Sequence, residues 1–342
     1  MGNNADWLAL TVEEALEPEL PICDAHHHLW DFRAGQTETR YLLDDLLADT
    51  NSGHNIVSTI FIECGGMYRD EGPTALKPVG ETEYVDGVAT KSESGLYGPT
   101  RVAAGIVGHA NLLLGDGVAP VLEAHITAGG GRFRGIRHVV PWDASDELPV
   151  IRGARPPHLL IEDAFRAGFA YLARHNLSFE AWLYHPQISE LTDLAHAFPG
   201  TSIVLNHLGG VLGIGPYAGK REEIFATWQA DVAKLAACQN VVAKIGGLNM
   251  DINGFGWHEK PKPPTSEELM EATRPYYEYM IELFGVDRCM FESNFPVEKL
   301  TCGYGIIWNT FKRLTAGYSD DEKAKLFHDT AARIYCLVGE AG

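Results

Sequence analysis

Short apolar runs rich in β-branched residues alternate along the chain with longer segments in which apolar residues recur every three or four positions. The short runs have the length and composition of buried strands, and the longer segments have the period of amphipathic helices. Eight such runs predict eight strands, at residues 21–25, 56–63, 101–107, 134–140, 177–184, 201–207, 241–246 and 288–294.

Two of the predicted helices are well defined. Residues 186–198 place Ile188, Leu191 and Leu194 on one face, and residues 319–337 open with Ser319 and Glu322 in the spacing of a capping box. Strands that alternate with helices imply a parallel sheet. Eight such units in 342 residues favour a closed (β/α)8 TIM barrel over an open, doubly wound sheet.

The predicted barrel covers residues 21–342 and follows an N-terminal extension of residues 1–20. Long connections are predicted after strand two (65–99, with a helix at 81–94) and after strand seven (249–264). Both leave the C-terminal strand ends, where barrel enzymes keep their active sites. They are therefore expected to form substrate walls or lids, and plain surface insertions are the alternative.

Composition narrows the class of protein. A formal charge of −19, from 27 basic and 46 acidic residues, argues against a nucleic-acid partner. No apolar stretch is long enough to span a membrane, and residues 1–21 lack the features of a signal peptide. Six scattered cysteines without a C-x-x-C motif are typical of reduced, cytoplasmic thiols. The sequence predicts no particular oligomeric state.

The strongest candidate for chemistry is the segment Asp-Ala-His-His-His-Leu-Trp-Asp at residues 24–31. Side chains at positions i and i+2 of a strand share a face, so His26 and His28 converge while His27 points away. Two imidazoles on one strand form half of a site for a divalent metal. A polar strand end whose histidines only satisfy local hydrogen bonds is the alternative.

Two further strand ends carry polar side chains. The sixth predicted strand ends in His207, which can face His26 and His28 across the barrel axis. On the eighth strand, Glu292 and Asn294 share a face, and Glu292 is expected one layer below Asn294. A buried Glu292 needs a partner, and Lys244 on strand seven is the candidate. A structural Glu292–Lys244 pair and a catalytic role for either residue both remain open.

With these motifs, the chain resembles the amidohydrolase superfamily, in the amidohydrolase-2 branch that includes pyrone-dicarboxylate lactonase and sugar lactonases of the fuconolactonase type. The resemblance runs from about Pro21 to the end of the chain. Its motifs are the histidine segment, Phe-Arg-Gly-Ile-Arg-His (133–138), Leu-Ser-Phe-Glu and His-Pro-Gln (within 177–187), Leu-Asn-His-Leu-Gly-Gly (205–210), Val-Ala-Lys-Ile-Gly-Gly (242–247) and Ala-Ala-Arg-Ile-Tyr (331–335).

The resemblance implies an active site lined by His26, His28 and His207, with a divalent metal, Zn²⁺ or Mn²⁺. It also implies that a strand-four arginine holds an anionic substrate group. Arg134 and Arg137 are three positions apart, so only one can point inward, and we predict Arg137. The family's strand-eight aspartate, a general base, is replaced by Asn294, which cannot accept a proton and adds no charge to a metal site. Asn294 stays a candidate catalytic residue, because its carbonyl oxygen can still ligate a metal or orient a water.

The sequence therefore predicts a hydrolase that opens a lactone or activated ester of a small, carboxylated substrate, with the attacking water oriented by the histidines. The missing base is His207, His185 or Glu63. One rival is a metal-dependent decarboxylase of an aromatic or enol acid, and Asn294 counts against it. A second rival is a non-catalytic binding protein.

Three further side chains each have two possible roles. Lys244 is a candidate for substrate binding as well as for the pair with Glu292. Trp182 and Tyr184 can stack on a ring-shaped substrate if strand five turns them inward, and aromatic core packing is the alternative.

Overall fold

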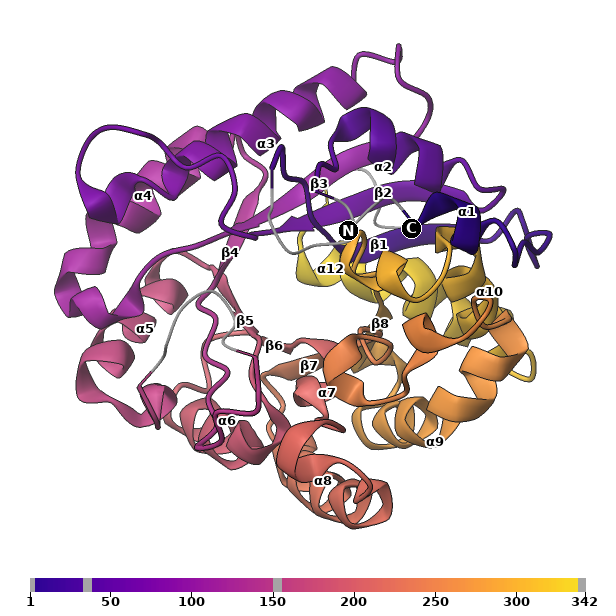
Figure 1. The fold of residues 1–342 in the computed structure, drawn as a ribbon. Coiled ribbons are helices and arrows are strands. Elements are labelled where there is room, and N and C mark those ends of the chain that lie inside the picture. Colours follow the sequence, from indigo (N-terminus) through magenta and orange to yellow (C-terminus); the bar gives the residue numbers. More distant parts are fainter. Residues whose placement is uncertain (1–3, 33–38, 150–155, 338–342) are drawn as a thin grey trace.

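The computed structural model describes residues 4–32, 39–149 and 156–337. Its eight strands are all parallel and lie in sequence order around a barrel (Figure 1). A parallel bridge between His27 and Phe295 joins the first and last strand ends. The predicted (β/α)8 barrel is confirmed. The strands are β1 (Pro21–His27), β2 (Asn55–Ile62), β3 (Arg101–Gly108), β4 (Phe133–Arg137), β5 (Ser178–Ala181), β6 (Ile203–Leu205), β7 (Val241–Ile245) and β8 (Cys289–Phe291).

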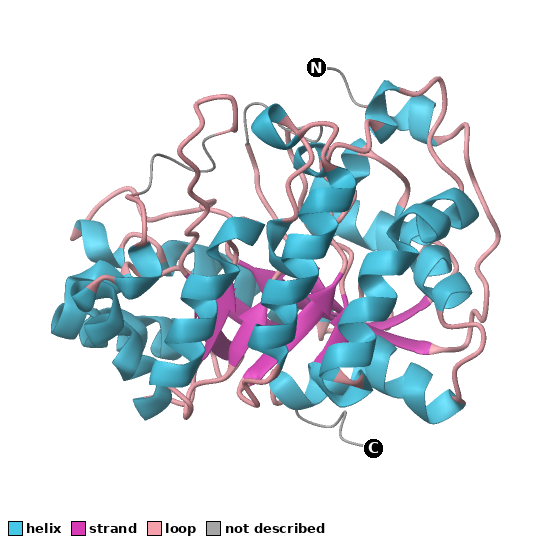
Figure 2. Cartoon of the chain, turned by 90° about the horizontal axis from the view of Figure 1, so that it is seen from below, coloured by secondary structure: helices cyan, strands magenta, loops and turns pink. Residues whose placement is uncertain are grey.

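Helices surround the strands on the outside of the barrel (Figure 2). The predicted helix at 186–198 corresponds to α6, and the one at 81–94 to α3. The α-helical segments are α1 (Ala5–Leu8), α2 (Leu43–Thr50), α3 (Val79–Ser92), α4 (Ala119–Ala128), α5 (Asp163–Arg174), α6 (Ile188–Ala197), α7 (His207–Gly210), α8 (Arg221–Ala236), α9 (Ser266–Phe284), α10 (Tyr304–Leu314), α11 (Asp320–Ala324) and α12 (Thr330–Ile334).

The last predicted helix contains a π-helical turn. Its capping box is present, since Ser319 Oγ accepts from the Glu322 backbone N–H at 3.3 Å and Glu322 Oε2 accepts from the Ser319 N–H at 2.9 Å. A π-helical turn, η10 (Lys325–Asp329), then separates α11 from α12. Such a turn inserts an extra residue and rotates the helix that follows. The predicted helical segment at 319–337 is therefore present as continuous helical turns over residues 320–334, with a π-helical turn in its middle.

The barrel interior is apolar toward the N-terminal strand ends. Tyr335 and Leu337, which follow α12, belong to one buried apolar cluster with side chains from the strands. These interior side chains include Cys23, Ala25, Ile60, Ile62, Ala104, Val107, Val204, Val242 and Met290. The C-terminal segment thus closes one end of the barrel, and the polar side chains gather toward the other end.

Three connections at the C-terminal strand ends are long. Residues 63–100 between β2 and β3 contain α3, and residues 246–265 between β7 and α9 contain two 3-10 turns, Asp251–Asn253 and Trp257–Glu259. The third runs from β4 to α5, residues 138–162, and was not predicted as a long loop. Residues 150–155 of it lie outside the described residues.

The described part of the N-terminal extension packs on the barrel. Thr11 Oγ1 donates to the Pro263 carbonyl at 2.8 Å, and Lys312 Nζ donates to the Leu16 carbonyl at 2.7 Å.

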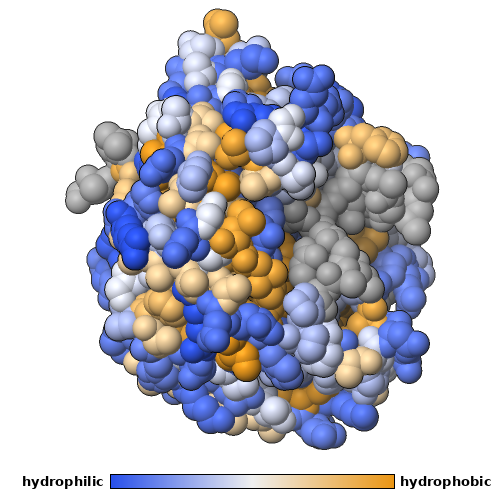
Figure 3. All heavy atoms as spheres, turned by 90° about the vertical axis from the view of Figure 1, so that its left-hand side faces the viewer, coloured by the Kyte–Doolittle hydropathy of each residue, from blue (hydrophilic) through white to orange (hydrophobic). Residues whose placement is uncertain are grey.

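On the side that carries α4 and α5, polar and apolar surface atoms are intermixed (Figure 3). Among the described helices, none combines the length and apolar character needed to cross a bilayer.

Candidate active site

His26 and His28 lie on the inner side of the first strand end, and His27 lies on the other side. The Nε2 atoms of His26 and His28 are 3.2 Å apart. His27 instead contacts Thr59 Oγ1 at 2.9 Å through its Nε2, and burial lowers its pKa to about 3. The alternation of strand side chains therefore brings His26 and His28 together, as expected from the sequence.

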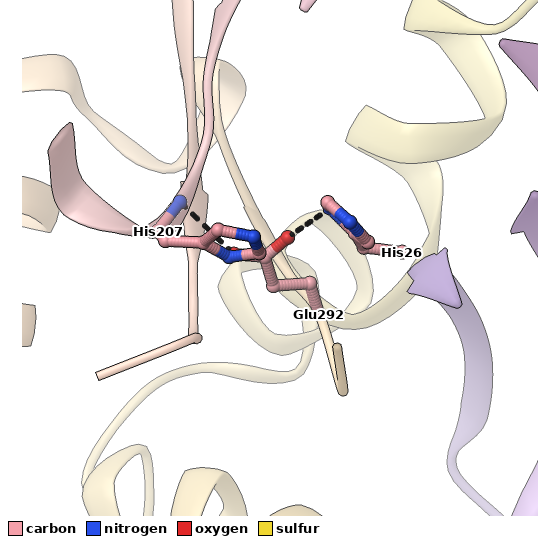
Figure 4. A group of neighbouring side chains, drawn as sticks. All are labelled: His26, His207 and Glu292. Carbon is pink, nitrogen blue, oxygen red and sulfur yellow. Dashed lines mark hydrogen bonds and ion pairs between the residues drawn. The ribbon is translucent and has the colours of Figure 1, made fainter. Parts of the chain in front are cut away.

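Glu292 joins His26 to His207 (Figure 4). One carboxylate oxygen lies 2.8 Å from His26 Nδ1, and the other lies 2.7 Å from His207 Nδ1. The His207 backbone N–H also donates to Glu292 Oε1, at 3.2 Å. All three side chains are at most 3 % exposed, so this contact replaces water for each of them.

Two glycines after β7 leave room for this arrangement. A Cβ atom on Gly247, which has a φ of +66°, would lie 2.2 Å from His207 Nδ1. A Cβ atom on Gly246 would lie 2.5 Å from Glu292 Cγ. Any larger residue at either position would displace Glu292 or the His207 ring, which explains the Ile-Gly-Gly sequence at this strand end.

The contacts of the rings bear on where their protons lie. His28 Nδ1 is 2.7 Å from the Ile62 carbonyl, which can only accept, so this nitrogen carries the proton. Burial and the nearby positive charge of Lys244 hold the pKa of His26 well below its usual value, so the ring is neutral. Its Nδ1 lies 2.8 Å from Glu292 Oε2 and 3.5 Å from Lys244 Nζ. The Nε2 atoms of His26 and His28 are close enough to each other for both to contact one bound cation.

A candidate metal site follows from these contacts. Within the described residues, His26, His207 and Glu292 offer ligand atoms that all lie within 4.8 Å of one another. His28 adds a further nitrogen beside His26. The carboxylate of Glu292 supplies the negative charge that Asn294 lacks, so the donor set fits a divalent ion.

Arg137 reaches the same cluster from β4. Its Nε donates to Glu63 Oε1 at 2.8 Å, its Nη2 donates to the Glu63 carbonyl, and its Nη1 is 3.3 Å from His26 Nε2. Arg134 points elsewhere, since its Nε donates to the Tyr335 carbonyl at the closed end of the barrel. Of the two arginines, Arg137 is therefore the one beside the histidines, and Glu63 holds it there.

The sequence-based pairing of Lys244 with Glu292 is wrong. Lys244 Nζ lies 2.9 Å from Glu180 Oε2, and both side chains are fully buried. Glu180 also accepts from Asn206 Nδ2 and from the Tyr335 hydroxyl. In the β7–β8 register Lys244 is opposite Met290, so Glu292 lies two residues nearer the barrel mouth. Lys244 also approaches the cluster, with its Nζ 3.5 Å from His26 Nδ1.

Asn294 lies in the turn that follows β8. Its backbone N–H donates to the His26 carbonyl at 2.9 Å, and its φ of +54° is one that asparagine tolerates. Its side-chain nitrogen has no hydrogen-bond partner among the described residues. The turn is tied to β1 by Asp24, whose carboxylate accepts from Ser293 Oγ at 2.5 Å and from the Tyr304 hydroxyl at 2.9 Å.

The three candidates from strand five lie differently. The ring centroid of Trp182 is 4.8 Å from that of His207, so Trp182 forms a wall of the cluster. The Tyr184 hydroxyl instead donates to the Pro149 carbonyl at 3.1 Å. His185 packs on Tyr217 and accepts from the Leu212 backbone N–H, and burial lowers its pKa to about 4. These contacts direct His185 away from His207.

Glu298 is a buried carboxyl group that sequence reasoning missed. It is 1 % exposed, and its two oxygens have no hydrogen-bond partner among the described residues. Burial raises its pKa to about 8, although the neighbouring Asn249 partly offsets this effect; the charge of Glu292 adds to the rise and Asn294 opposes it. No pattern in the sequence marks it, because the turn that buries it is set by tertiary contacts.

We expect Glu298 to make the protein less stable as the pH rises. Its pKa is raised from an ordinary 4.5, so the folded state keeps a proton that the unfolded state loses. Stability from this group is fully present below pH 4.5 and is lost as the pH rises through about 8. Thermal unfolding measured between pH 5 and 9 should show that the parent loses stability as the pH rises and that Glu298→Gln does not. The difference in free energy of unfolding between the two should change by on the order of a few kcal/mol in favour of Glu298→Gln. Glu278→Gln, at an exposed position, is the control. An equal pH dependence in parent and Glu298→Gln would contradict the assignment.

Comparison with known proteins shows the family of the chain. A family model described as amidohydrolase matches residues 23–337. The chain belongs to the amidohydrolase family. An uncharacterised protein, y4mH, of Sinorhizobium fredii is 35% identical over 335 residues, which cover 93% of this chain and 99% of the relative. An L-fucono-1,5-lactonase of Burkholderia ambifaria is 27% identical over 252 residues, which cover 70% of this chain and 74% of the relative.

Solved structures show the same fold. An amidohydrolase from Burkholderia multivorans with bound zinc has a TM-score of 0.69 and 22% identity, with coverage of 92% of this chain and 99% of that one. A 5-carboxyvanillate decarboxylase from Novosphingobium aromaticivorans with bound manganese has a TM-score of 0.56 and 11% identity, with coverage of 96% and 100%. The resemblance to the amidohydrolase-2 branch is thus confirmed, and the scaffold is one that serves hydrolases and decarboxylases.

Proposed function

We propose that this amidohydrolase hydrolyses a lactone, or a similarly activated ester, of a small carboxylated substrate. The observation that carries the proposal is the contact between Glu292 and His207 Nδ1, at 2.7 Å. A carboxylate on one ring nitrogen holds that proton in place and leaves the other nitrogen as a proton acceptor. The pair can therefore do the work that the missing strand-eight aspartate does elsewhere in the family.

In this mechanism His207 is the general base. Its Nε2 takes a proton from the attacking water, whose oxygen forms the new bond to the lactone carbonyl carbon. The ring C–O bond then breaks, and the leaving oxygen receives the proton from His207. Glu292 stabilises the imidazolium while it exists, as a buried carboxylate does for a catalytic histidine.

Arg137 has a narrower role than a residue that holds an anionic substrate group with its whole guanidinium. Its Nε and Nη2 already donate to Glu63. Only its Nη1 is therefore directed toward the histidines. A cation there stabilises the negative charge that develops on the carbonyl oxygen, or one oxygen of a substrate carboxylate. The proposal assigns the base to His207 rather than Glu63, since the Glu63 carboxylate is bound to Arg137.

A divalent ion, Zn²⁺ or Mn²⁺, would be held by His26 and His28, with Glu292 balancing its charge. When bound, such an ion polarises the carbonyl group and makes a bound water more acidic. His207 is also close enough to be a ligand. The variant His207→Gln separates the two roles: as the base it should keep metal occupancy and lose turnover by at least about 100-fold, whereas a ligand would lose both.

The test is an acid-release assay of the purified protein against sugar lactones and carboxylated lactones, with and without added Zn²⁺ or Mn²⁺. We expect the protein to open one class of lactone faster than buffer alone does. Chelation should remove this activity, and return of the metal should restore it. If the protein hydrolyses none of these lactones even with metal present, the proposal is overturned. Release of carbon dioxide from an aromatic or enol acid would instead assign the protein as a decarboxylase.

A further inference from the structure

The peptide unit that joins Glu63 to Cys64 is held from both sides. Its carbonyl oxygen accepts a hydrogen bond from Arg137 Nη2. Its N–H, on Cys64, donates to Glu81 Oε1 at 3.0 Å. The same Glu81 oxygen accepts from the Gly66 backbone N–H at 2.9 Å. One carboxylate in α3 therefore holds the loop that carries Glu63, and this loop in turn holds Arg137.

Glu81 has an unusual location for an acidic residue. It lies in the first turn of α3, yet it is only 1 % exposed. Gly80, just before it, allows the helix to sit directly on the loop, since a Cβ atom there would lie 2.6 Å from the Arg69 backbone nitrogen. Burying a carboxylate is costly unless donors surround it, and here the donors are the backbone of the β2 loop.

The two hydrogen bonds reinforce each other. When a carboxylate accepts from the N–H of a peptide, the peptide is polarised and its carbonyl becomes a better acceptor. Turning this peptide would break both bonds at once. The other anchor of Arg137 is the side chain of the same residue, since its Nε donates to Glu63 Oε1 at 2.8 Å, and its Nη1 is directed to His26. Its orientation depends on a peptide that Glu81 fixes.

We propose that Glu81 is a positioning residue for Arg137, acting through the Glu63–Cys64 peptide. The inference rests on the proposed function only in that Arg137 is taken to face the substrate. Loss of the carboxylate frees the peptide to rotate and lets the guanidinium leave its place beside His26. A shift of this kind, of about 1 Å, costs about 10- to 100-fold in turnover.

The first test does not depend on turnover. Arginine modification by phenylglyoxal, followed by peptide mass analysis, measures how accessible Arg137 is in the folded protein. We expect Glu81→Ala to speed modification of Arg137 by about 10-fold or more, with Arg132 as the internal reference. Glu81→Gln should stay near the parent, because an amide oxygen accepts from the same N–H groups. Glu83→Ala, two residues along α3 and exposed, should change nothing.

Should Glu81→Ala fail to fold, Glu81→Asp serves instead, since it keeps the charge and withdraws it by one methylene. It too is expected to expose Arg137. Unchanged modification of Arg137 in a folded Glu81→Ala or Glu81→Asp protein would overturn the proposal.

The second test is a double-mutant cycle with Arg137→Ala on a lactone that the parent opens. Glu81→Ala should lower kcat/KM about 10- to 100-fold in the parent and by less than about twofold in Arg137→Ala. A merely structural role would give equal losses in both backgrounds, and that result would contradict the proposal. If no lactone is opened by the parent, the proposed function fails, and the modification experiment still decides the role of Glu81.

Discussion

Replacing Glu292 by glutamine is expected to weaken metal binding by about 10- to 100-fold and to lower turnover by at least about 100-fold. The carboxylate contacts both His26 and His207, at 2.8 and 2.7 Å. It carries the net charge of the cluster, because Glu63 is balanced by Arg137 and Glu180 by Lys244. A glutamine has nearly the same shape and offers one acceptor oxygen, so it removes the charge and one of the two imidazole contacts.

Metal content after dialysis against graded chelator, together with acid release, checks this expectation. Glu278→Gln is the matched control, since Glu278 forms an exposed pair with Arg274 at 3.3 Å. It should keep the metal affinity and turnover of the parent. A Glu292→Gln protein that retains both within about twofold would show that Glu292 only fills space.

The sequence predicted what depends on local geometry. The alternation of side chains along a strand separates His26 and His28 from His27, whatever the rest of the chain does. The barrel itself follows from eight strand–helix units. The short β6 is different: it ends at Leu205 because His207 and Leu208 adopt positive φ values, which no apolar pattern indicates.

The ion pairs between buried side chains on different strands could not be predicted from the sequence. Glu180, Lys244 and Glu292 come from three strands, and any pairing among them depends on the stagger between strands. The register that sets Lys244 opposite Met290 decides the outcome. Glu81 escaped notice for a similar reason, since its helix lies in a long connection whose packing on the β2 loop is a tertiary feature.

The largest loss of stability is expected from Lys244→Met. Lys244 and Glu180 are fully buried, with Nζ 2.9 Å from Oε2. Removing the lysine leaves a buried carboxylate with only Asn206 and Tyr335 as donors. Breaking one partner of a buried pair costs about 3–5 kcal/mol, because the remaining charge is uncompensated. The midpoint of urea unfolding measures this loss.

A double variant separates the contribution of the Lys244 charge to stability from the contribution of its packing. Glu180→Gln combined with Lys244→Met removes both charges, and we expect it to recover most of the stability, since a buried pair as a whole adds little. The matched control is Lys234→Met, which breaks an exposed pair with Asp231 of the same 2.9 Å length and should cost less than about 1 kcal/mol. If Lys244→Met costs no more than this control, Glu180 takes up a proton or reaches water when Lys244 is lost. A double variant as unstable as Lys244→Met would mean that the lysine stabilises the barrel floor by its packing, and that His26 is supported from below by shape rather than by charge.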